Sequence, residues 1–372
     1  MRTRVAVAMS GGVDSAVAAL LLVQQGYDVL GLMMRLWAEE EGDTDGQGLR
    51  ANRCCTPQGV EDARRVAQLL DIPFYLLNYE REFKAAVVDP FVGEYAAGRT
   101  PNPCLACNRH IKFGLLLERA RSLGADLLAT GHYARIVQGE GRYRLLKSAD
   151  RRKDQSYVLY MLGQRELGQV LFPLGELTKD EVRARAAQAG LPVGEKPESQ
   201  EICFVGDEGY HPFLSRQAPA TVRPGPIVDA TGRVLGQHQG LAFYTVGQRH
   251  GLGLASSGHT DVKGPLYVLR LDPVRNALVV GPEEALGQQE LIAGQVSFVA
   301  GYAPPVSGVT AKVRYKAPEA PGTLLPLDEG RVRLVFDQPQ RAITPGQAVV
   351  FYQGEEVLGG GIINRTQAVS SK

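Results

Sequence analysis

Two adjacent glycines, framed by serines and an aspartate, follow the first apolar run and constrain the fold more than any other feature of the chain. Residues 4–9 have the pattern of a buried strand, residues 10–15 read Ser-Gly-Gly-Val-Asp-Ser, and residues 13–25 have helical spacing that stops at Gly26. Glycines let the backbone turn tightly with its N–H groups directed at one point, and a helix N-terminus adds about half a positive charge there. The segment therefore predicts an anion-binding turn between a strand and a helix.

Strand and helix patterns alternate through the first half of the chain. Further apolar runs occupy residues 28–34, 73–77 and 126–130, and helical patterns occupy residues 59–70 and 109–123. Another helix is expected after the capping box at residues 178–181, ending at Gly190. This alternation predicts an α/β fold with a doubly wound parallel sheet, in which ligands bind at the carboxyl ends of the strands.

The second half of the chain has a different sequence pattern. Beyond about residue 205, short alternating segments such as residues 310–315, 331–336 and 348–352 are separated by turns rich in glycine and proline. These patterns predict two small antiparallel β modules, the last of them barrel-like. We therefore expect a catalytic α/β domain at residues 1–205, a central β domain at residues 206–285 and a C-terminal β-barrel domain at residues 286–372.

The loop at residues 10–15 lacks the Gly-Lys-Ser/Thr of a Walker A motif. A loop without lysine suits pyrophosphate held as a leaving group better than γ-phosphoryl transfer, and Asp14 can hold Mg²⁺ or orient the loop. The segment resembles the SGGxDS loop of the ATP-pyrophosphatase family, whose members adenylate a carbonyl oxygen. At the sheet edge, Gly131 should admit the nucleotide and Met34 should flank the adenine. Contacts with ATP are expected from Ala8, Met9, Ser10, Gly11, Gly12, Val13, Asp14, Ser15, Met34 and Gly131.

Charge is unevenly spread, although the net charge is only +1. Residues 99–153 carry twelve Lys and Arg against four Asp and Glu, a local excess of +8. An ordinary solvated face would explain this stretch. A surface that follows a phosphodiester backbone would explain it equally well. The composition does not decide between the two.

Cysteine usage and apolar runs bear on the compartment. Five cysteines without the spacing of a disulfide framework favour a reducing cytoplasm. Cys54 and Cys55 stand side by side, where they are poor chelators of one metal, and they are assigned no role. The longest apolar run of the first half, residues 16–23, is far shorter than the ~18 residues of a membrane span, so no membrane association is expected.

The other three cysteines lie in segments that suggest chemistry. Cys104 and Cys107 precede the helix expected at residues 109–123, where the helix start and Arg109 should lower the pKa of a thiol. Cys203 closes the α/β half. The pair lacks the further ligands of a structural zinc site and the surrounding fold of a thioredoxin-like motif. A persulfide relay between two thiols and an iron–sulfur cluster on three thiols both stay open.

Motifs along the whole chain resemble those of the bacterial tRNA-specific 2-thiouridylases and occur in the same order. Besides residues 10–15, they are residues 98–103 (GRTPNP), 107–108 (CN), 129–133 (ATGHY), 153–157 (KDQSY), 202–204 (ICF), 236–240 (GQHQG), 245–253 (TVGQRHGLG), 313–315 (VRY), 345–347 (PGQ) and 358–363 (LGGGII). The resemblance implies that ATP activates C2 of the wobble uridine and that sulfur then replaces its oxygen, releasing AMP and pyrophosphate. It implies the anticodon stem-loops of Lys, Glu and Gln tRNAs as substrates, and a cysteine desulfurase or sulfur-relay protein as donor.

The resemblance also assigns roles by position. Cys107 matches the family's nucleophile, and Cys203 matches its persulfide-bearing cysteine. The segment that meets the target base is matched by Asn102, Pro103 and Cys104. Contacts with tRNA are implied for Lys153, Asp154, Gln155, Arg314 and Tyr315.

One position departs from the family pattern. Many members carry aspartate where this chain has Cys104, and a two-thiol persulfide mechanism is the usual description of those enzymes. The third cysteine favours a [4Fe-4S] cluster ligated by Cys104, Cys107 and Cys203 with one open iron, and a Cys107/Cys203 persulfide–disulfide relay is the alternative.

Two other functions fit parts of the sequence. An ATP-pyrophosphatase synthetase acting on a small molecule would share the loop but need neither the cysteines nor the basic stretch. A non-catalytic RNA-binding protein would need the basic stretch alone.

Overall fold

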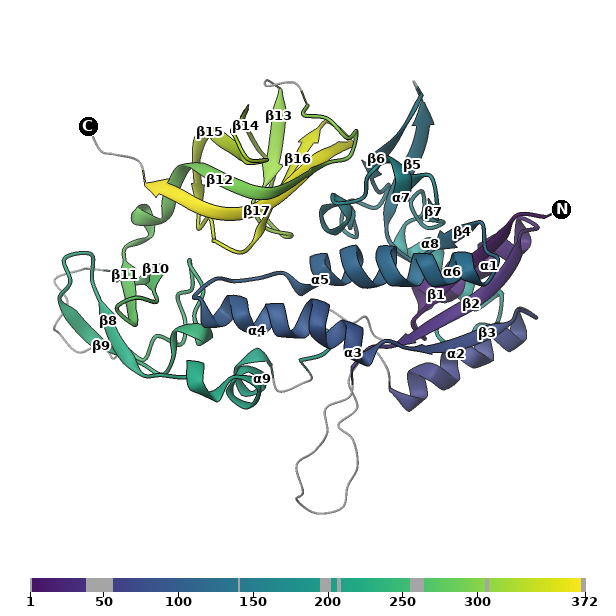
Figure 1. Cartoon of the computed structure of the whole chain (residues 1–372), viewed down its shortest axis with the longest axis horizontal. Coiled ribbons are helices and arrows are strands. Elements are labelled where there is room, and N and C mark those ends of the chain that lie inside the picture. Colours follow the sequence, from purple (N-terminus) through teal and green to yellow (C-terminus); the bar gives the residue numbers. More distant parts are fainter. Residues whose placement is uncertain are drawn as a thin grey trace, which may run out of the picture.

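The structure is a computed structural model, and it describes residues 2–37, 56–139, 141–194, 202–205, 209–254, 264–304 and 308–368, with side chains to residue 364. Cys54 and Cys55 lie outside these ranges. Figure 1 shows an α/β unit at one end, a small β sheet at the other end and a β-barrel above the helices that run between them. Among the helices of the described ranges, none combines the length and hydropathy that crossing a membrane requires.

Five parallel strands form the sheet of the α/β unit, in the order β3-β2-β1-β4-β7. The strands are β1 (Arg4–Met9), β2 (Asp28–Arg35), β3 (Phe74–Asn78), β4 (Leu127–Ala129) and β7 (Val170–Leu171). The order reverses beside β1, which makes the carboxyl end of β1 the expected binding edge of such a sheet. The α/β fold predicted from the sequence is confirmed.

The helices that pack on this sheet begin where the sequence predicted. Helix α1 (Val13–Gln24) is buried over most of its length because it contacts both β1 and α8 (Lys179–Gln188). Helix α2 (Pro57–Leu69) is capped by the hydroxyl of the residue before it. At the start of α8, Thr178 and Glu181 form the expected capping box, each accepting the backbone N–H of the other.

Two long helices with π-helical middles lie side by side below the barrel (Figure 1). The first consists of α3 (Glu80–Phe83), a π-helical stretch (Lys84–Val88) and α4 (Asp89–Ala96). The second consists of α5 (Pro103–Ala106), a π-helical stretch (Cys107–Leu116) and α6 (Leu117–Ser122). Stretches of this rare helix type often mark functional sites.

The second long helix starts earlier than the sequence predicted. It begins at Pro103 and not at residue 109, because Oδ1 of Asn102 accepts the backbone N–H of Cys104 at 3.1 Å and caps the helix. Proline fits the first helical position, where its missing N–H is not needed. Cys104 and Cys107 therefore lie inside the helix and not in front of it.

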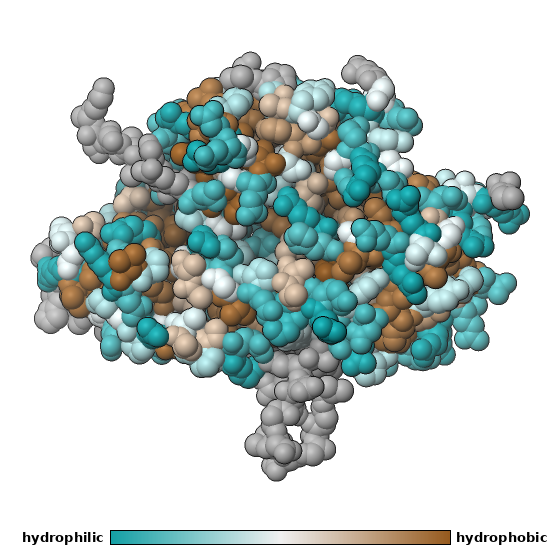
Figure 2. Space-filling view, viewed as in Figure 1, coloured by the Kyte–Doolittle hydropathy of each residue, from teal (hydrophilic) through white to brown (hydrophobic). Residues whose placement is uncertain are grey.

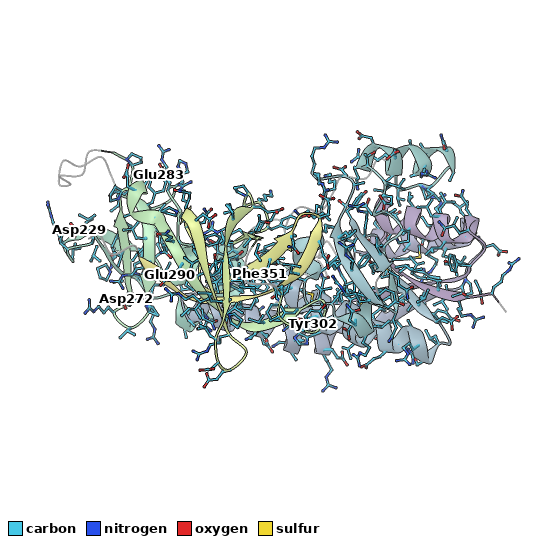
Figure 3. All side chains as sticks on the ribbon, turned by 90° about the horizontal axis from the view of Figure 1, so that it is seen from above. Asp229, Asp272, Glu283, Glu290, Tyr302 and Phe351 are labelled. Carbon is cyan, nitrogen blue, oxygen red and sulfur yellow. The ribbon has the colours of Figure 1, made fainter. Side chains whose placement is uncertain are left out.

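Two β modules follow, as predicted. The small sheet has the order β10-β11-β8-β9, and its pairing of β11 with β8 is parallel where we expected antiparallel strands. The barrel has the order β12-β15-β14-β13-β16-β17, and β12 also pairs with β17, which closes it. Seen from above, Phe351 lies within the barrel, while Asp229 and Asp272 lie at the outer end of the small sheet (Figure 3). The limits at residues 205 and 285 stay a prediction.

The remaining elements complete the described chain. The small sheet contains β8 (Gly225–Val228), β9 (Val234–His238), β10 (Tyr267–Asp272) and β11 (Ala277–Gly281). The barrel contains β12 (Gly287–Phe298), β13 (Val309–Lys312), β14 (Ala320–Pro326), β15 (Val332–Arg341), β16 (Ala348–Gln353) and β17 (Glu356–Ala368). Short helices are α7 (Gln164–Leu167) and α9 (Tyr210–Gln217). Single 3₁₀ turns lie at Ser156–Leu159, Pro219–Thr221, Leu241–Phe243 and Glu283–Leu286.

A basic hairpin of the α/β unit, β5 (Ala134–Gly139) and β6 (Arg142–Lys147), docks on the barrel. The carboxylate of Glu356, at the start of β17, receives Arg142 at 2.7 Å on one oxygen and Arg144 at 2.7 Å on the other. The Glu356 side chain is 9% exposed, so this charge is neutralised where little water reaches it. The two arginines therefore fasten the hairpin to the barrel.

This docking explains much of the basic stretch at residues 99–153. Its partners in the barrel are acidic side chains about two hundred residues further along the chain. Arg135 and Arg151 pair with Glu355, Arg142 and Arg144 pair with Glu356, and Lys147 pairs with Glu319. These cations join parts of the fold. This role is a third explanation of the basic stretch, besides a solvated face and a nucleic-acid surface. On the face seen in Figure 2, hydrophilic side chains are mixed with smaller hydrophobic groups.

Replacing Glu356 by glutamine should destabilise the protein by about 2 kcal/mol. The amide keeps the shape but leaves two guanidinium groups without their counter-charge, and the effect is smaller than for a fully buried pair because both arginines are partly solvated. Urea denaturation of the two proteins measures the difference. Glu329→Gln, which removes an exposed pair with Arg331, is the control and should change stability by less than about 0.5 kcal/mol. Equal effects of both substitutions would refute the docking role of Glu356.

Candidate active site

The loop after β1 is held in shape by one of its own serines. Ser15 is buried, accepts the N–H of Ser10 at 3.1 Å and donates to the carbonyl of Gly12 at 3.1 Å. Gly11 has a φ of +68°, and a side chain there would collide with the carbonyl of Gly59 in α2. Ser15 therefore shapes the loop, and of the two serines expected to donate to an anion, Ser10 is the exposed one.

Asp14, in the first turn of α1, has two partners from distant parts of the chain. Lys179 places Nζ 2.7 Å from Oδ1 and 2.8 Å from Oδ2, and the Tyr133 hydroxyl donates to Oδ1 at 2.8 Å. The side chain of Lys179 is 7% exposed and that of Asp14 is 34% exposed, so one side of the ion pair is closed and the other faces solvent. Sequence reasoning missed Lys179, because it lies 165 residues from Asp14.

Gly131, after β4, packs against the start of α1. A Cβ at this position would lie 2.8 Å from the carbonyl carbon of Asp14 and 2.9 Å from the nitrogen of Ser15. The glycine is thus required for the close approach of two protein segments, whereas the sequence suggested an approach of the nucleotide. Met34, near the end of β2, is half-buried beside the core. Contact of Gly131 or Met34 with a nucleotide stays a prediction.

The three predicted cysteines affect one another electrostatically around the second long helix. Cys104 is exposed as a residue, Cys107 is buried and Cys203 is half-buried. Burial raises the pKa of the Cys107 thiol to about 12 and also raises the pKa of Cys104, while the charge of Lys112 lowers both pKa values by less. The expected lowering of the thiol pKa is therefore wrong, because packing around the sulfurs outweighs the nearby positive charge. A thiolate at Cys107 needs a further stabilising partner.

Iron–sulfur clusters are ligated by cysteine thiolates, and Cys104, Cys107 and Cys203 are all free thiols. Within the described ranges, no group of three or more His, Cys, Asp or Glu side chains is placed to hold a metal ion. The residue type suits a cluster, and ligation by Cys104, Cys107 and Cys203 stays a prediction.

One short segment, residues 130–133, contacts both the loop and the second long helix, which carries Cys104 and Cys107. His132 is buried, with Nδ1 2.7 Å from Oγ1 of Thr130, and its ring lies 5.8 Å from that of Phe113 in the π-helical stretch. Burial holds the pKa of His132 well below its usual value, and the charge of Lys112 acts in the same direction. His132 is therefore neutral, and Tyr133 beside it reaches Asp14.

Residues 98–103, which we call the strap, lead into α5 and are held by the barrel. The N–H of Thr100 donates to the carbonyl of Pro345 at 3.0 Å, and the amide of Gln347 donates to the Thr100 carbonyl at 2.8 Å. Between them Gly346 has a φ of +90°, and a Cβ there would lie 2.9 Å from the nitrogen of Thr100. Two motifs that are far apart in the sequence thus bind each other directly.

The end of the strap opens on a cavity. Asn102 and Pro103 line a space of about 550 Å³, whose other walls come from α4, the second long helix and the barrel. Arg109 also lines it, and so does Arg99, whose guanidinium is paired with Glu94. The volume lies within the range of small-ligand sites, ~300–1,000 Å³. This cavity borders the segment that the sequence assigned to the target base.

Arg314 and Tyr315, expected to contact tRNA, serve the fold. The guanidinium of Arg314 donates to the carbonyl of Val246 at 2.8 Å and to that of Ala342 at 3.0 Å, which ties the central β module to the barrel. Tyr315 is 38% exposed, and its hydroxyl donates to the carbonyl of Asp154 at 3.1 Å. A contact of either residue with tRNA stays a prediction, for which Tyr315 presents the more accessible surface.

The other expected tRNA contacts, residues 153–155, lie beside them. Asp154 is buried and accepts the N–H of Ser148 at 3.0 Å and the hydroxyl of Ser156 at 2.8 Å. Oε1 of Gln155 accepts the N–H of Tyr133 at 3.0 Å. The half-buried Lys153 donates its backbone N–H to the preceding turn. Gln155 therefore supports the segment that reaches Asp14. Binding of residues 153–155 to tRNA stays a prediction.

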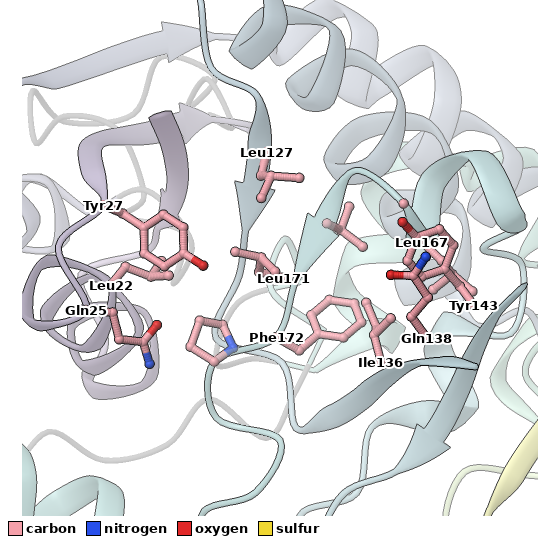
Figure 4. Close-up of a pocket in the computed structure, with 13 residues that line it drawn as sticks. Leu22, Gln25, Tyr27, Leu127, Ile136, Gln138, Tyr143, Leu167, Leu171 and Phe172 are labelled. Atoms are coloured by element: carbon pink, nitrogen blue, oxygen red, sulfur yellow. The ribbon is translucent and has the colours of Figure 1, made fainter. Parts of the chain in front are cut away.

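A second cavity, of about 370 Å³, lies away from these groups (Figure 4). Leu22, Gln25 and Tyr27 line it from the end of α1, and Leu127 and Leu171 line it from the sheet. It therefore lies at the opposite end of α1 from the phosphate loop. None of the predicted site residues line it.

Three family models match successive parts of the chain. Residues 3–207 match a "tRNA methyl transferase HUP domain", residues 211–282 a "tRNA methyl transferase PRC-barrel domain" and residues 288–363 an "Aminomethyltransferase beta-barrel domain". Together they span the α/β unit, the small sheet and the barrel.

Curated relatives match almost the whole chain. The tRNA-specific 2-thiouridylase MnmA of Moorella thermoacetica is 52% identical over 96% of this chain and 98% of its own. The proteins of the same name from Symbiobacterium thermophilum and from Clostridium perfringens are 51% and 48% identical, over 97% of this chain and 92% and 98% of their own. Similarity of this degree over full length confirms the resemblance first seen in the motifs, and the chain belongs to the family of the tRNA-specific 2-thiouridylases.

Proposed function

We propose that the chain is an ATP-dependent tRNA 2-thiouridylase that acts on the wobble uridine. The observation that carries the proposal is that residues 130–133 contact the anion-binding loop through Tyr133 and the second long helix, which carries Cys104 and Cys107, through His132. Such a site has a group to activate an oxygen and a group to replace it. The names of the full-length relatives support the same substrate and product.

In the first step the C2 oxygen of the uridine attacks the α-phosphorus of ATP, and pyrophosphate leaves. The N–H groups of the loop and the N-terminus of α1 stabilise the negative charge on the phosphates. The solvent-facing side of Asp14 is the place for Mg²⁺. The base has to leave the anticodon stack to reach this site, as in other base-modifying enzymes, and the cavity beside Asn102 offers room for a nucleotide.

In the second step sulfur attacks C2, and AMP leaves with the original oxygen. In a relay, the terminal sulfur of a Cys203 persulfide attacks C2, and the Cys107 thiolate then attacks the remaining Cys203 sulfur. The adduct breaks at the Cys203 S–S bond, which leaves sulfur on the base and a Cys107–Cys203 disulfide. A dithiol reductant restores both thiols.

The reaction itself is the test. Incubation with ATP, Mg²⁺, a sulfide source and unmodified tRNA should give 2-thiouridine in nucleoside digests, with one AMP and one pyrophosphate per modified base. Pyrophosphate release that is independent of tRNA would favour a synthetase acting on a small molecule. Absence of ATP turnover under every condition would favour a binding protein.

The sulfur chemistry of the site favours a [4Fe-4S] cluster on Cys104, Cys107 and Cys203. Such a cluster supplies an iron with an open coordination position for sulfur. It would also give Cys107 the partner that its raised pKa requires, since a metal holds a thiol in its deprotonated form.

Cys104→Asp separates the cluster from the relay. If the cluster is correct, protein purified without oxygen contains iron and sulfide and absorbs near 400 nm, and the variant loses the iron and at least about 100-fold of its thiolation rate. If the relay is correct, the wild type lacks iron and the variant keeps its activity, because many family members carry aspartate here. Tryptic mapping for a Cys107–Cys203 disulfide after one turnover checks the second outcome.

Other features of the chain complete the proposal. We infer that a cysteine desulfurase or a sulfur-relay protein supplies sulfur, that Lys, Glu and Gln tRNAs are the acceptors, and that the reaction takes place in the cytoplasm. We also propose domain limits near residues 205 and 285, which the ranges of the three family models support.

A further inference from the structure

A positively charged group closes one side of the phosphate loop, although the loop itself contains no lysine. Lys179 is the first residue of α8 and is 5% exposed. Its backbone N–H donates to Asp150 at 3.1 Å, and its Nζ contacts both oxygens of Asp14. Lys179 is therefore held both at its backbone and at its ammonium group. An exposed ion pair between long, mobile side chains is not held in this way.

Asp14 presents an electrostatic problem for a nucleotide site. Its carboxylate stands in the first turn of α1, beside the N–H groups that are to receive a polyanion. Unneutralised, one negative charge within ~5 Å of a triphosphate would oppose binding by an amount worth at least ~10-fold in affinity. A hydrogen bond from the neutral Tyr133 hydroxyl orients the carboxylate but does not cancel its charge.

We propose that Lys179 is a positioning residue of the nucleotide site, which cancels the charge of Asp14 and holds its carboxylate so that its open side can take Mg²⁺. Two of the three observed bonds to Asp14 come from this ammonium group, and both oxygens are held. Since Lys179 is shielded and Asp14 is partly exposed, the carboxylate lies on the side from which a ligand arrives. The inference rests on the proposed use of ATP but not on tRNA or on sulfur.

A double-mutant cycle with ATP binding as the readout tests this role. The proteins are the full chain, Lys179→Met, Asp14→Asn, Asp14→Asn/Lys179→Met and Lys179→Arg. The dissociation constant of ATP is measured calorimetrically without tRNA and without Mg²⁺, because Asp14→Asn also removes the group proposed to hold the metal. Lys84→Met is the matched control, because it removes an exposed lysine–aspartate pair with Asp89 far from the loop. Thermal unfolding of every variant shows which of them are folded.

Lys179→Met should weaken ATP binding about 10–100-fold, and this loss should shrink in 0.5 M salt, where charge repulsion is screened. The double variant should bind ATP more tightly than Lys179→Met, because the unpaired carboxylate is gone. Lys179→Arg should stay within a few-fold of the wild type, and Lys84→Met should be unchanged. If the double variant binds as weakly as Lys179→Met, Lys179 acts on the phosphates and the proposal is overturned.

Two measurements keep the test independent of folding and of the proposed function. If Lys179→Met fails to fold, the double variant Asp14→Asn/Lys179→Met is compared with Asp14→Asn. Equal affinity of the two for ATP supports charge cancellation by Lys179. A tenfold loss of affinity in the double variant refutes it. If the wild type binds ATP but does not thiolate tRNA, the proposed function fails while the cycle still reports on Lys179. If the wild type does not bind ATP, both fail together.

Discussion

Cys107→Ser should reduce the formation of 2-thiouridine by about a thousandfold or more, while adenylation of the tRNA continues. Serine has nearly the same shape in this buried position, but it can neither carry sulfur nor ligate iron. Activation depends on the loop after β1, whereas Cys107 lies on the second long helix. Mass spectrometry of digested tRNA measures the product, and release of pyrophosphate in the presence of tRNA measures the activation.

Cys203→Ser is the comparison for this variant. Cys203 is essential both in the cluster and in the relay. Cys203→Ser should therefore reduce the formation of 2-thiouridine as much as Cys107→Ser does. Loss of pyrophosphate release in Cys107→Ser would mean that Cys107 serves the fold of the site, and retained thiolation would refute its role in sulfur transfer. Neither outcome depends on which of the two sulfur mechanisms operates.

The parts of the site that are continuous in sequence could be predicted, because local geometry determines them. The loop at residues 10–15 follows a strand and starts a helix, and the structure has β1, the turn and α1 at the expected residues. The parallel sheet follows from the same alternation of strands and helices. At the second long helix the prediction was late by six residues, because the cap at Asn102 and the proline after it were not interpreted as a helix start.

The parts that depend on partners from elsewhere in the chain could not be predicted. Nothing near Asp14 in the sequence indicates Lys179, and nothing near Arg142 or Arg144 indicates Glu356. The basic stretch therefore suggested a surface, whereas five of its twelve Lys and Arg form ion pairs with glutamates of the barrel. The predicted lowering of the Cys107 pKa was wrong for the same reason. The position of a residue in a helix can be predicted from the sequence, but the burial of its side chain cannot.

The strap shows how the distant modules contribute to the site. Thr100 has its N–H and its carbonyl bonded to the barrel, and the next turn of the chain carries Cys104 and Cys107. The position of the thiols thus depends on the barrel as well as on the α/β unit.

Gly11→Ala should abolish ATP binding within the measurable range, a loss of at least about 100-fold. Alanine at a φ of +68° costs about 1–2 kcal/mol by itself, and here its methyl group would also collide with the carbonyl of Gly59. That carbonyl belongs to the first turn of α2, which cannot shift without breaking its own cap at Thr56. The loop has to move instead, and its N–H groups then no longer converge. Calorimetric titration with ATP measures the affinity, and thermal unfolding measures the stability.

Gly26→Ala separates the collision from the backbone strain. Gly26 has a φ of +84° and ends α1, but a Cβ there would have no neighbour within 4 Å. This variant should lose about 1 kcal/mol of stability and bind ATP as the wild type does. If Gly11→Ala also loses only stability and keeps its affinity for ATP, the loop tolerates the methyl group. In that case the close packing of α2 against the loop does not determine the shape of the site. If Gly11→Ala alone loses ATP, the contact between the loop and α2 is a requirement for nucleotide binding.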